Sequence, residues 1–238
     1  MQRLSTSNLM HAWEDGLNLH PTLRAIQLVM VGYPGLSNQD AKALSIGSRD
    51  ALLIRLRQVL FGSSIVSTST CNYCQEQMDL SFDLSTIKVD DPKPNVRQTV
   101  TIQDYQIEFR LPCSSDLIEQ NAPAPTNLLS KCIQSVNING KAVSFDQLDL
   151  GLIQKAADHI ANLDGAANIQ INIECPSCGE LQTSRFNILS FLWQEIDTWA
   201  RLVLHEIHLL ASRYGWSERS ILEMNPIKRR LYLQMVVL

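Results

Sequence analysis

CNYC at residues 71–74 and CPSC at residues 175–178 form two Cys-x-x-Cys pairs, with residues 75–174 between them. A two-residue spacer lets both sulfurs of one pair bind the same ion from a tight turn, and two pairs complete the tetrahedron of a structural zinc site. Because such a site has no open position for water, the pattern predicts a structural zinc ion and argues against metal catalysis. The predicted ligands are Cys71, Cys74, Cys175 and Cys178.

Both pairs are flanked by residues with strand periodicity. Apolar residues alternate with polar ones on the way into the second pair and out of the first. A period of two is typical of a strand, so each pair is expected at a strand end, as in a zinc ribbon. The alternating residues are Ile169, Ile171 and Ile173 before Cys175, and Met78, Leu80, Phe82 and Leu84 after Cys74.

Three other interpretations of the cysteines were considered. A redox pair would open a helix, whereas GELQT at residues 179–183 continues as turn and strand. Two disulfides would suit a secreted chain, but residues 1–20 lack the succession of regions that makes a signal peptide. A ribbon that has lost its metal is the third. Zinc or a vestigial zinc ribbon is the favoured interpretation, and Cys113 and Cys132 are predicted to be buried thiols.

Composition limits the class of protein. The chain has 238 residues, of which 45% are hydrophobic, which is typical of a globular protein with one or two domains. No apolar run approaches the roughly 20 residues that cross a bilayer, so no membrane span is expected. A net charge of −4 gives no general attraction to phosphate backbones, and nucleic-acid binding would need a local basic patch such as residues 228–230.

The sequence before residue 62 is predicted to be helical. Pro21 can open a helix that runs to Val31. Ser48 is expected to cap a second helix with a leucine-rich face, and Gly62 to stop it. The three arginines of that helix are interpreted as a solvated face, with partner docking as the alternative. They are Arg49, Arg55 and Arg57.

The C-terminal region contains the clearest helical pattern. Apolar residues recur there at spacings that average close to 3.67, which predicts one long, nearly straight helix with a single packed face. They are Ile188, Leu192, Ile196, Trp199, Val203, Ile207 and Leu210. Ser217 should cap a short helix after it, and Asn225-Pro226 should open a last one.

The middle of the chain is predicted to be rich in strands. Residues 100–111 form an expected hairpin that turns at Gln103-Asp104, and residues 131–149 contain a small hairpin or insertion around Asn139-Gly140. The predicted fold class is therefore α+β, with helical terminal regions around a small antiparallel β part and its zinc-ribbon-like cysteine pairs. The expected division is residues 1–62, helical; 63–187, β-rich and zinc-ribbon-like with a helical insertion; and 188–238, helical.

No catalytic constellation is found in the sequence. His205 and His208 lie three residues apart, whereas a zincin motif needs a spacing of four. Both are predicted to point away from the packed face, so exposed histidines are favoured over ligands. Glu206 lies at the edge of that face and is expected to pair with Arg213, Arg229 or Arg230.

Several short patterns, in this order, resemble the T-even-type phage baseplate protein family, also described as baseplate hub assembly chaperones. Their order indicates more than any one of them, and they extend from about Ile46 to Leu233. The patterns are IGSRD at residues 46–50, FG at 61–62, the first cysteine pair, FRLP at 109–112 with DL at 116–117, ECPSCG at 174–179, EIHLLA at 206–211, YGWSE at 214–218, IL at 221–222, RR at 229–230 and YL at 232–233.

The resemblance implies a non-enzymatic subunit or assembly chaperone of a phage-like contractile tail or a contractile injection system. It would act by protein–protein binding to baseplate or tail-hub proteins, in the bacterial cytoplasm during assembly or in the finished particle. Trp216, Arg229 and Arg230 would then belong to a segment for packing or for docking a partner. A corner between two helices stabilised by Trp216 explains the same residues.

The sequence also offers two rival functions. A zinc-ribbon regulatory or nucleic-acid-binding module would depend on the basic residues 228–230, and the acidic net charge disfavours it. A metal-dependent hydrolase would use His205 and His208, but the sequence offers no third inward ligand.

Overall fold

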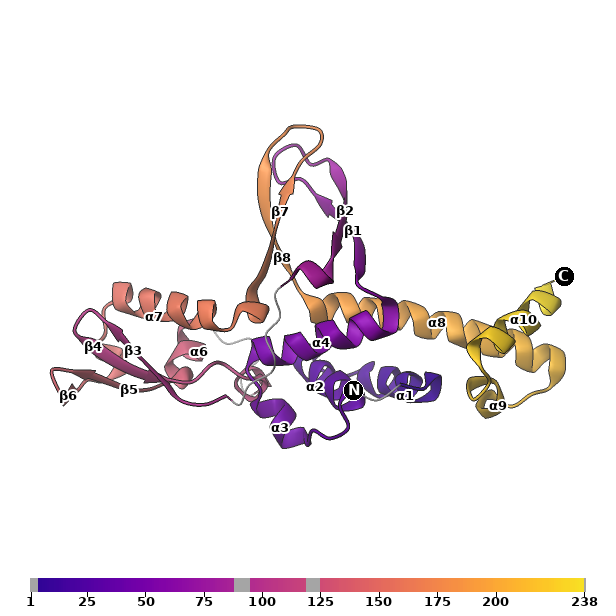
Figure 1. Ribbon diagram of the computed structural model, residues 1–238, viewed down its shortest axis with the longest axis horizontal. Coiled ribbons are helices and arrows are strands. Elements are labelled where there is room, and N and C mark those ends of the chain that lie inside the picture. The colour runs from indigo at the N-terminus through magenta and orange to yellow at the C-terminus, as the bar shows by residue number, and fades with distance from the viewer. Residues whose placement is uncertain (1–3, 88–94, 119–124, 238) are drawn as a thin grey trace. The chain divides into compact units, whose positions relative to one another are not determined.

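The computed structural model of the chain describes residues 4–87, 95–118 and 125–237 (Figure 1). The chain forms two compact units, one combining residues 1–36 with 189–238 and the other spanning residues 37–188. The predicted α+β class is confirmed, with small antiparallel sheets and the four cysteines in one cluster. The predicted division into three regions, with boundaries after residues 62 and 187, stays a prediction.

The first unit is built from helices. They are α1 (Thr6–Gly16), α2 (Pro21–Gly32), α8 (Ile188–Tyr214), α9 (Glu218–Leu222) and α10 (Pro226–Val237). Local chemistry explains where they begin. The Ser5 hydroxyl accepts from the Asn8 N–H at 3.1 Å, and Ser217 caps α9 in the same way at 3.3 Å. No helix among the described residues is long and apolar enough to span a bilayer.

Helix α8 is the long helix predicted from the apolar stripe. Six of the seven stripe residues are buried, and Trp199 is half-buried while its neighbour Ala200 is fully buried. The polar face of α8 also contacts the N-terminal helices. The Trp13 indole N–H donates to Asp197 Oδ1 at 2.8 Å, and the Arg24 guanidinium lies 4.5 Å from the centre of the Trp193 ring. These contacts link the two ends of the chain within one unit.

The second unit contains a four-stranded antiparallel sheet in the order β3-β4-β5-β6. Its strands are β3 (Gln98–Ile102), β4 (Tyr105–Phe109), β5 (Ile133–Ile138) and β6 (Lys141–Ala142). Both predicted hairpins are confirmed. The β5–β6 turn places Asn139 and Gly140 at φ 50° and 75°, as an Asn-Gly turn requires. Helices α6 (Pro125–Cys132) and α7 (Leu150–Leu163) lie beside the sheet (Figure 1). The unit also contains α5 (Ser114–Ile118) and the 3-10 turns η2 (Phe145–Gln147) and η3 (Gly165–Asn168).

The apolar face of α7 packs against the sheet. Leu152 and Ala156 of α7 are buried with Ile107 of β4 and Val136 of β5 in one cluster. Phe109 and Ile160 extend the same packing toward α6. The core of this part therefore joins the apolar face of one helix to one face of the sheet.

Helices α3 (Asn38–Ala43) and α4 (Ile46–Phe61) begin the second unit. The cap of α4 is Ser45, whose hydroxyl accepts from the Ser48 N–H at 3.0 Å, so the predicted cap at Ser48 is wrong by one turn. The predicted solvated arginine face is also wrong for two of its three members. Arg49 and Arg57 are buried, and polar partners of each guanidinium offset the cost of burying its charge. Arg57, for example, donates to the Gly62 carbonyl at 2.6 Å.

Two antiparallel ribbons carry the cysteine pairs. One consists of β1 (Ser64–Thr70) and β2 (Gln77–Asp83), with the 3-10 turn η1 (Leu84–Thr86) after it, and the other of β7 (Ile169–Glu174) and β8 (Leu181–Phe186). Figure 1 shows the ribbons side by side with their turns together. We call residues 64–83 and 169–186 the arm.

The two ribbons of the arm have the same register. Thr70 pairs with Gln77 beside the first turn, and Glu174 pairs with Leu181 beside the second. Each residue of the second ribbon thus lies 104 positions after its counterpart. The counterparts Phe82 and Phe186 meet edge to face, with their ring centres 5.3 Å apart. The similarity of the cysteine pairs therefore extends through the strands that carry them.

Candidate metal centre

Each cysteine pair lies in a tight turn closed by two backbone hydrogen bonds. In the first turn the Gln75 N–H donates to the Cys71 carbonyl at 3.0 Å, and the Cys71 N–H donates to the Glu76 carbonyl at 2.8 Å. Gly179, Cys175 and Glu180 repeat both bonds in the second turn, at 2.8 and 3.0 Å. A turn and a strand, not a helix, follow each pair, which agrees with a zinc knuckle and disagrees with a redox motif.

The structure brings the four predicted ligands together. All four sulfurs lie within 4.8 Å of one another. Two of the separations between the ribbons are 3.7 Å, from the Cys71 to the Cys178 sulfur, and 3.6 Å, from the Cys74 to the Cys175 sulfur. A tetrahedral ion with Zn–S bonds near 2.3 Å places its sulfurs about 3.8 Å apart. The donor set and its spacing therefore fit a structural zinc ion.

The electrostatics of the cluster favour a cation. N–H groups of Cys74 and Tyr73 donate to the Cys71 sulfur and lower its pKa to about 7. An N–H of Glu180 also lowers the pKa of Cys178, but burial and the three neighbouring sulfurs raise it by more, to about 12. Four thiolates at this spacing repel one another, so they can all be deprotonated only around a bound metal.

A small apolar core supports the site from inside the arm. Cys71 and Cys175 are buried with Met78 and Ile173, and Leu80 and Ile171 pack against them half-buried. Cys74 and Cys178 are exposed. The first cysteine of each pair therefore anchors its turn to the core, and the second closes the cluster on the solvent side.

The sequence analysis missed Gln182, which links the two ribbons at the metal site. Its side-chain carbonyl accepts from the Asn72 N–H at 2.8 Å, and its amide donates to the Thr70 carbonyl at 3.4 Å. It is buried, although an amide is usually exposed. Gln182 is the counterpart of Met78, an apolar residue at the same register. The signal in the sequence that could have identified Gln182 was a polar residue at a strand position that faces inward.

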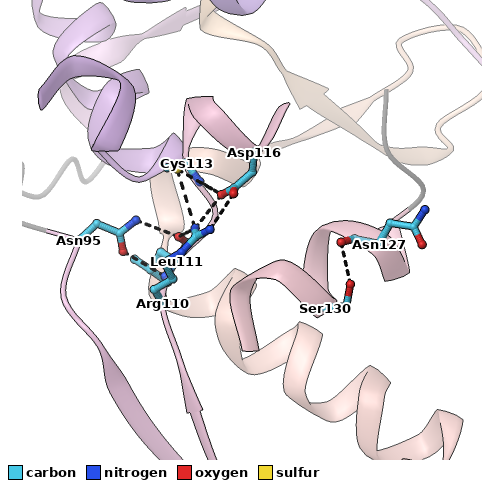
Figure 2. Close-up of polar contacts among 7 residues, drawn as sticks. All are labelled: Asn95, Arg110, Leu111, Cys113, Asp116, Asn127 and Ser130. Atoms are coloured by element: carbon cyan, nitrogen blue, oxygen red, sulfur yellow. Dashed lines mark hydrogen bonds and ion pairs between the residues drawn. The ribbon is translucent and has the colours of Figure 1, made fainter. Parts of the chain in front are cut away.

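A second cluster of polar side chains fixes the chain at the FRLP pattern, residues 109–112. Arg110 forms two parallel hydrogen bonds of 2.7 Å to the Asp116 carboxylate, and the Cys113 thiol lies 3.2 Å from Asp116 Oδ2 (Figure 2). Asn95 binds the Leu111 backbone on the other side, accepting from its N–H and donating to its carbonyl. The charge-assisted pair fixes the chain where β4 ends and α5 begins.

The Arg110–Asp116 pair changes the acidity of its members. Burial raises the pKa of Asp116, but the Arg110 guanidinium and the Cys113 N–H and thiol lower it by more, so it lies below its usual value. Burial raises the pKa of Cys113, and it raises that of Cys132 to about 12. Both cysteines are buried, as predicted, and both are protonated thiols at neutral pH.

The N-terminus of α4 binds to this cluster of polar side chains and to Asp164. The Asp164 carboxylate accepts from the Ser45 hydroxyl and the Gly47 N–H, both at 2.8 Å. Ser45 also forms a β-bridge with Cys113. Burial raises the pKa of Asp164 despite these bonds. We call residues 45–50, 110–116 and Asp164 the polar junction.

Arg49 and Asp50 complete the polar junction. Arg49 binds Asp50 Oδ1 at 2.7 Å and donates to the Ser114 hydroxyl at 3.2 Å. Burial raises the pKa of Asp50, and Arg49 opposes that shift. The Ile46 N–H also donates to the Pro112 carbonyl at 3.0 Å, so the IGSRD and FRLP patterns, far apart in the sequence, meet at the polar junction.

The C-terminal residues of interest form a packed corner. The Trp216 ring stacks on Tyr214 at 4.6 Å and meets Tyr232 edge to face at 4.8 Å. Arg229 is buried and donates to Glu206 Oε2 at 2.8 Å, which is one of the predicted pairs, while Arg230 is exposed. These contacts give the segment a packing role. A partner-binding role for Trp216, Arg229 and Arg230 stays a prediction.

The two histidines beside this corner do not meet other candidate ligands. His205 and His208 are both exposed on α8. The only group of potential metal ligands found among the described residues is the four-cysteine cluster. The expectation of exposed histidines is confirmed.

Comparison with known proteins identifies one family. The model of a family described as T4 bacteriophage base plate protein matches residues 34–193. No curated protein and no solved structure matches the chain. The matched range includes the polar junction and the whole arm, and it ends inside α8.

Proposed function

Because the chain belongs to the T4 bacteriophage baseplate protein family, we propose that it helps to build the baseplate or hub of a phage-like contractile tail or contractile injection system. It acts as a particle subunit or as an assembly chaperone, through protein–protein binding and without catalysis. It does so in the bacterial cytoplasm while the particle assembles. The family match over residues 34–193 is the observation that supports this proposal.

A reconstitution tests the role. The full chain is co-expressed with each baseplate and hub protein of the same particle, and complexes are isolated by size-exclusion chromatography. We expect a stable complex with at least one of them, and cells that lack the chain should form few or no complete baseplates. Mass spectrometry of purified particles then separates a subunit from a chaperone. Normal baseplates without the chain, together with no complex, would disprove the proposal.

We further propose that the four cysteines hold one structural zinc ion. The donor set of four thiols and the spacing of their sulfurs support it. In this role the ion supplies a fixed link between the ribbons and no chemistry. Metal analysis of protein purified without chelator should give about one zinc per chain. Protein without metal that melts at the same temperature as metal-loaded protein would exclude a structural ion.

A further inference from the structure

The acidic character of the chain is concentrated in the arm. The arm contains five of the 24 acidic residues and one of the 20 basic residues, so its net charge of −4 equals that of the whole chain. Asp83 and Arg185 lie near the end of the arm that is far from the cysteines. At that end Ser64 of β1 pairs with β2, and Ile169 of β7 pairs with β8. The half near the cysteines therefore carries carboxylates and no cation. These are Glu76, Asp79, Glu174 and Glu180.

Large apolar side chains are exposed at the same end. Tyr73 in the first turn is 64% exposed, and Leu181 after the second turn is 67% exposed. Pro176, which lies in the second turn, is also exposed. We call Tyr73, Pro176 and Leu181 with the four carboxylates the arm tip. Exposed aromatic and leucine side chains at the same end of the arm as these carboxylates are typical of a protein-binding surface.

The backbone that displays these side chains is held by specific contacts. Tyr73 lies between two cysteines of the cluster, and the Asn72 N–H beside it donates to Gln182 of the other ribbon. Leu181 is fixed by its pairing with Glu174. A surface on such a support loses little conformational entropy when it binds, which favours affinity.

The charge of the arm tip selects the class of partner. Four carboxylates without a cation repel the phosphates of nucleic acids and of anionic membranes. A zinc ion bound by four thiolates adds negative charge to the same end, since two positive charges meet four negative ones. A protein surface with basic side chains around an apolar centre is complementary in both respects.

We propose that the arm tip is a docking surface for a basic, apolar patch on another baseplate or hub protein of the same particle. This inference rests on the proposed function and specifies where the chain binds. Carboxylates at the rim steer the partner into contact, and Tyr73 and Leu181 provide the apolar centre.

The test measures binding of the purified full chain to each purified baseplate and hub protein of the particle, at low and at high salt. The double variant Tyr73→Ser/Leu181→Ser should bind about tenfold more weakly or worse. The variant Glu76→Gln/Glu180→Gln should associate more slowly and lose most of the salt dependence. Val66→Ser is the matched control, because Val66 is 72% exposed on the same arm away from the tip, and it should bind like the wild type. An unchanged zinc content shows that each variant keeps its fold.

The possible outcomes separate this inference from the proposed function. Wild-type affinity in both tip variants, with a baseplate protein bound, would overturn the docking surface and leave the proposed function intact. Failure of every baseplate and hub protein to bind would overturn the docking surface, and together with normal baseplates in cells that lack the chain it would overturn the proposed function as well. Tip variants that change only the self-association of the chain would identify a second copy as the occupant and refute the proposal.

Discussion

The arm and the polar junction solve the same problem in different ways. Each joins segments far apart in the sequence, Cys74 with Cys175 in the arm and Ser45 with Asp164 in the junction. The arm has a small core and relies on four sulfurs, whereas the junction is surrounded by helices and a sheet and relies on buried hydrogen bonds and ion pairs. A thin two-layered arm buries too little apolar surface to be stable alone, so it needs a cross-link.

The largest expected effect comes from removing one of the four cysteines proposed to bind zinc in the arm. Cys175→Ser deletes a buried ligand, and structural zinc sites contribute on the order of 10 kcal/mol to folding. We expect the arm to lose protection from hydrogen exchange while the sheet β3–β6 and α7 keep theirs. Ser177→Ala, in the same turn but without a ligand atom, is the control and should retain both zinc and protection. Equal protection of the arm in Cys175→Ser and wild type would show that the sulfurs do not hold the ribbons together.

The second effect concerns the ion pair of the polar junction. Asp116→Ala removes the buried carboxylate that the half-buried Arg110 binds. Because Arg110 is partly solvated, we expect a loss of between about 2 and 3 kcal/mol, below the cost of breaking a fully buried pair. Urea unfolding measures the loss. Arg97→Ala is the control. The ion pair of Arg97 with Glu108 is exposed, with 3.8 Å between the nitrogen and the oxygen, and it should contribute almost nothing to stability. Similar losses in the two variants would remove the distinction between buried and surface pairs here.

The same pair predicts a pH dependence. The pKa of Asp116 is lower in the folded protein than in the unfolded chain, so its contribution is complete above about pH 4 and declines as the pH falls through the lowered value. The pKa values of Asp50 and Asp164 are raised, and their contributions have the opposite sign, declining as the pH rises through the raised values. Asp116→Asn should therefore flatten the acid limb of the stability curve. An unchanged acid limb would contradict the lowered pKa.

A third effect tests the close approach of α4 to Asp164. A Cβ atom at Gly47 would overlap the Asp164 carboxylate, so Gly47→Ala must displace a group that accepts two buried hydrogen bonds. We expect a loss of about 2 kcal/mol in the free energy of unfolding. Gly165→Ala is the matched control, because nothing lies within 4 Å of a Cβ there. The comparison fails if both variants unfold at the same urea concentration.

Periodicity and cysteine spacing were sufficient to predict the arm and the long helix α8, because both depend on local patterns. They were not sufficient for the junction. Arg49 and Arg57 resemble solvated helix residues, and the sequence around Arg49 does not show that Ser114, 65 positions later, folds back to accept a hydrogen bond from it. Gln182 was missed for the same reason, since its partners Asn72 and Thr70 belong to the other ribbon. Buried polar networks depend on long-range contacts that composition does not encode.

The smallest effect lies within the arm, where a glutamine in the first turn occupies the position that a glycine has in the second. Gln75 has φ 62°, and its counterpart Gly179 has φ 73°. A left-handed conformation costs a residue with a side chain about 1 kcal/mol, whereas glycine adopts it freely. Gln75→Gly relieves that cost but makes the unfolded chain more flexible, so the net gain should be below about 1 kcal/mol. Gly179→Gln introduces the strain and should weaken the site. Competition with a chromogenic chelator measures both as zinc affinity, slightly higher in the first variant and lower in the second. If zinc affinity changes in the same direction in both variants, the two turns do not respond to backbone strain in the same way, despite their shared register.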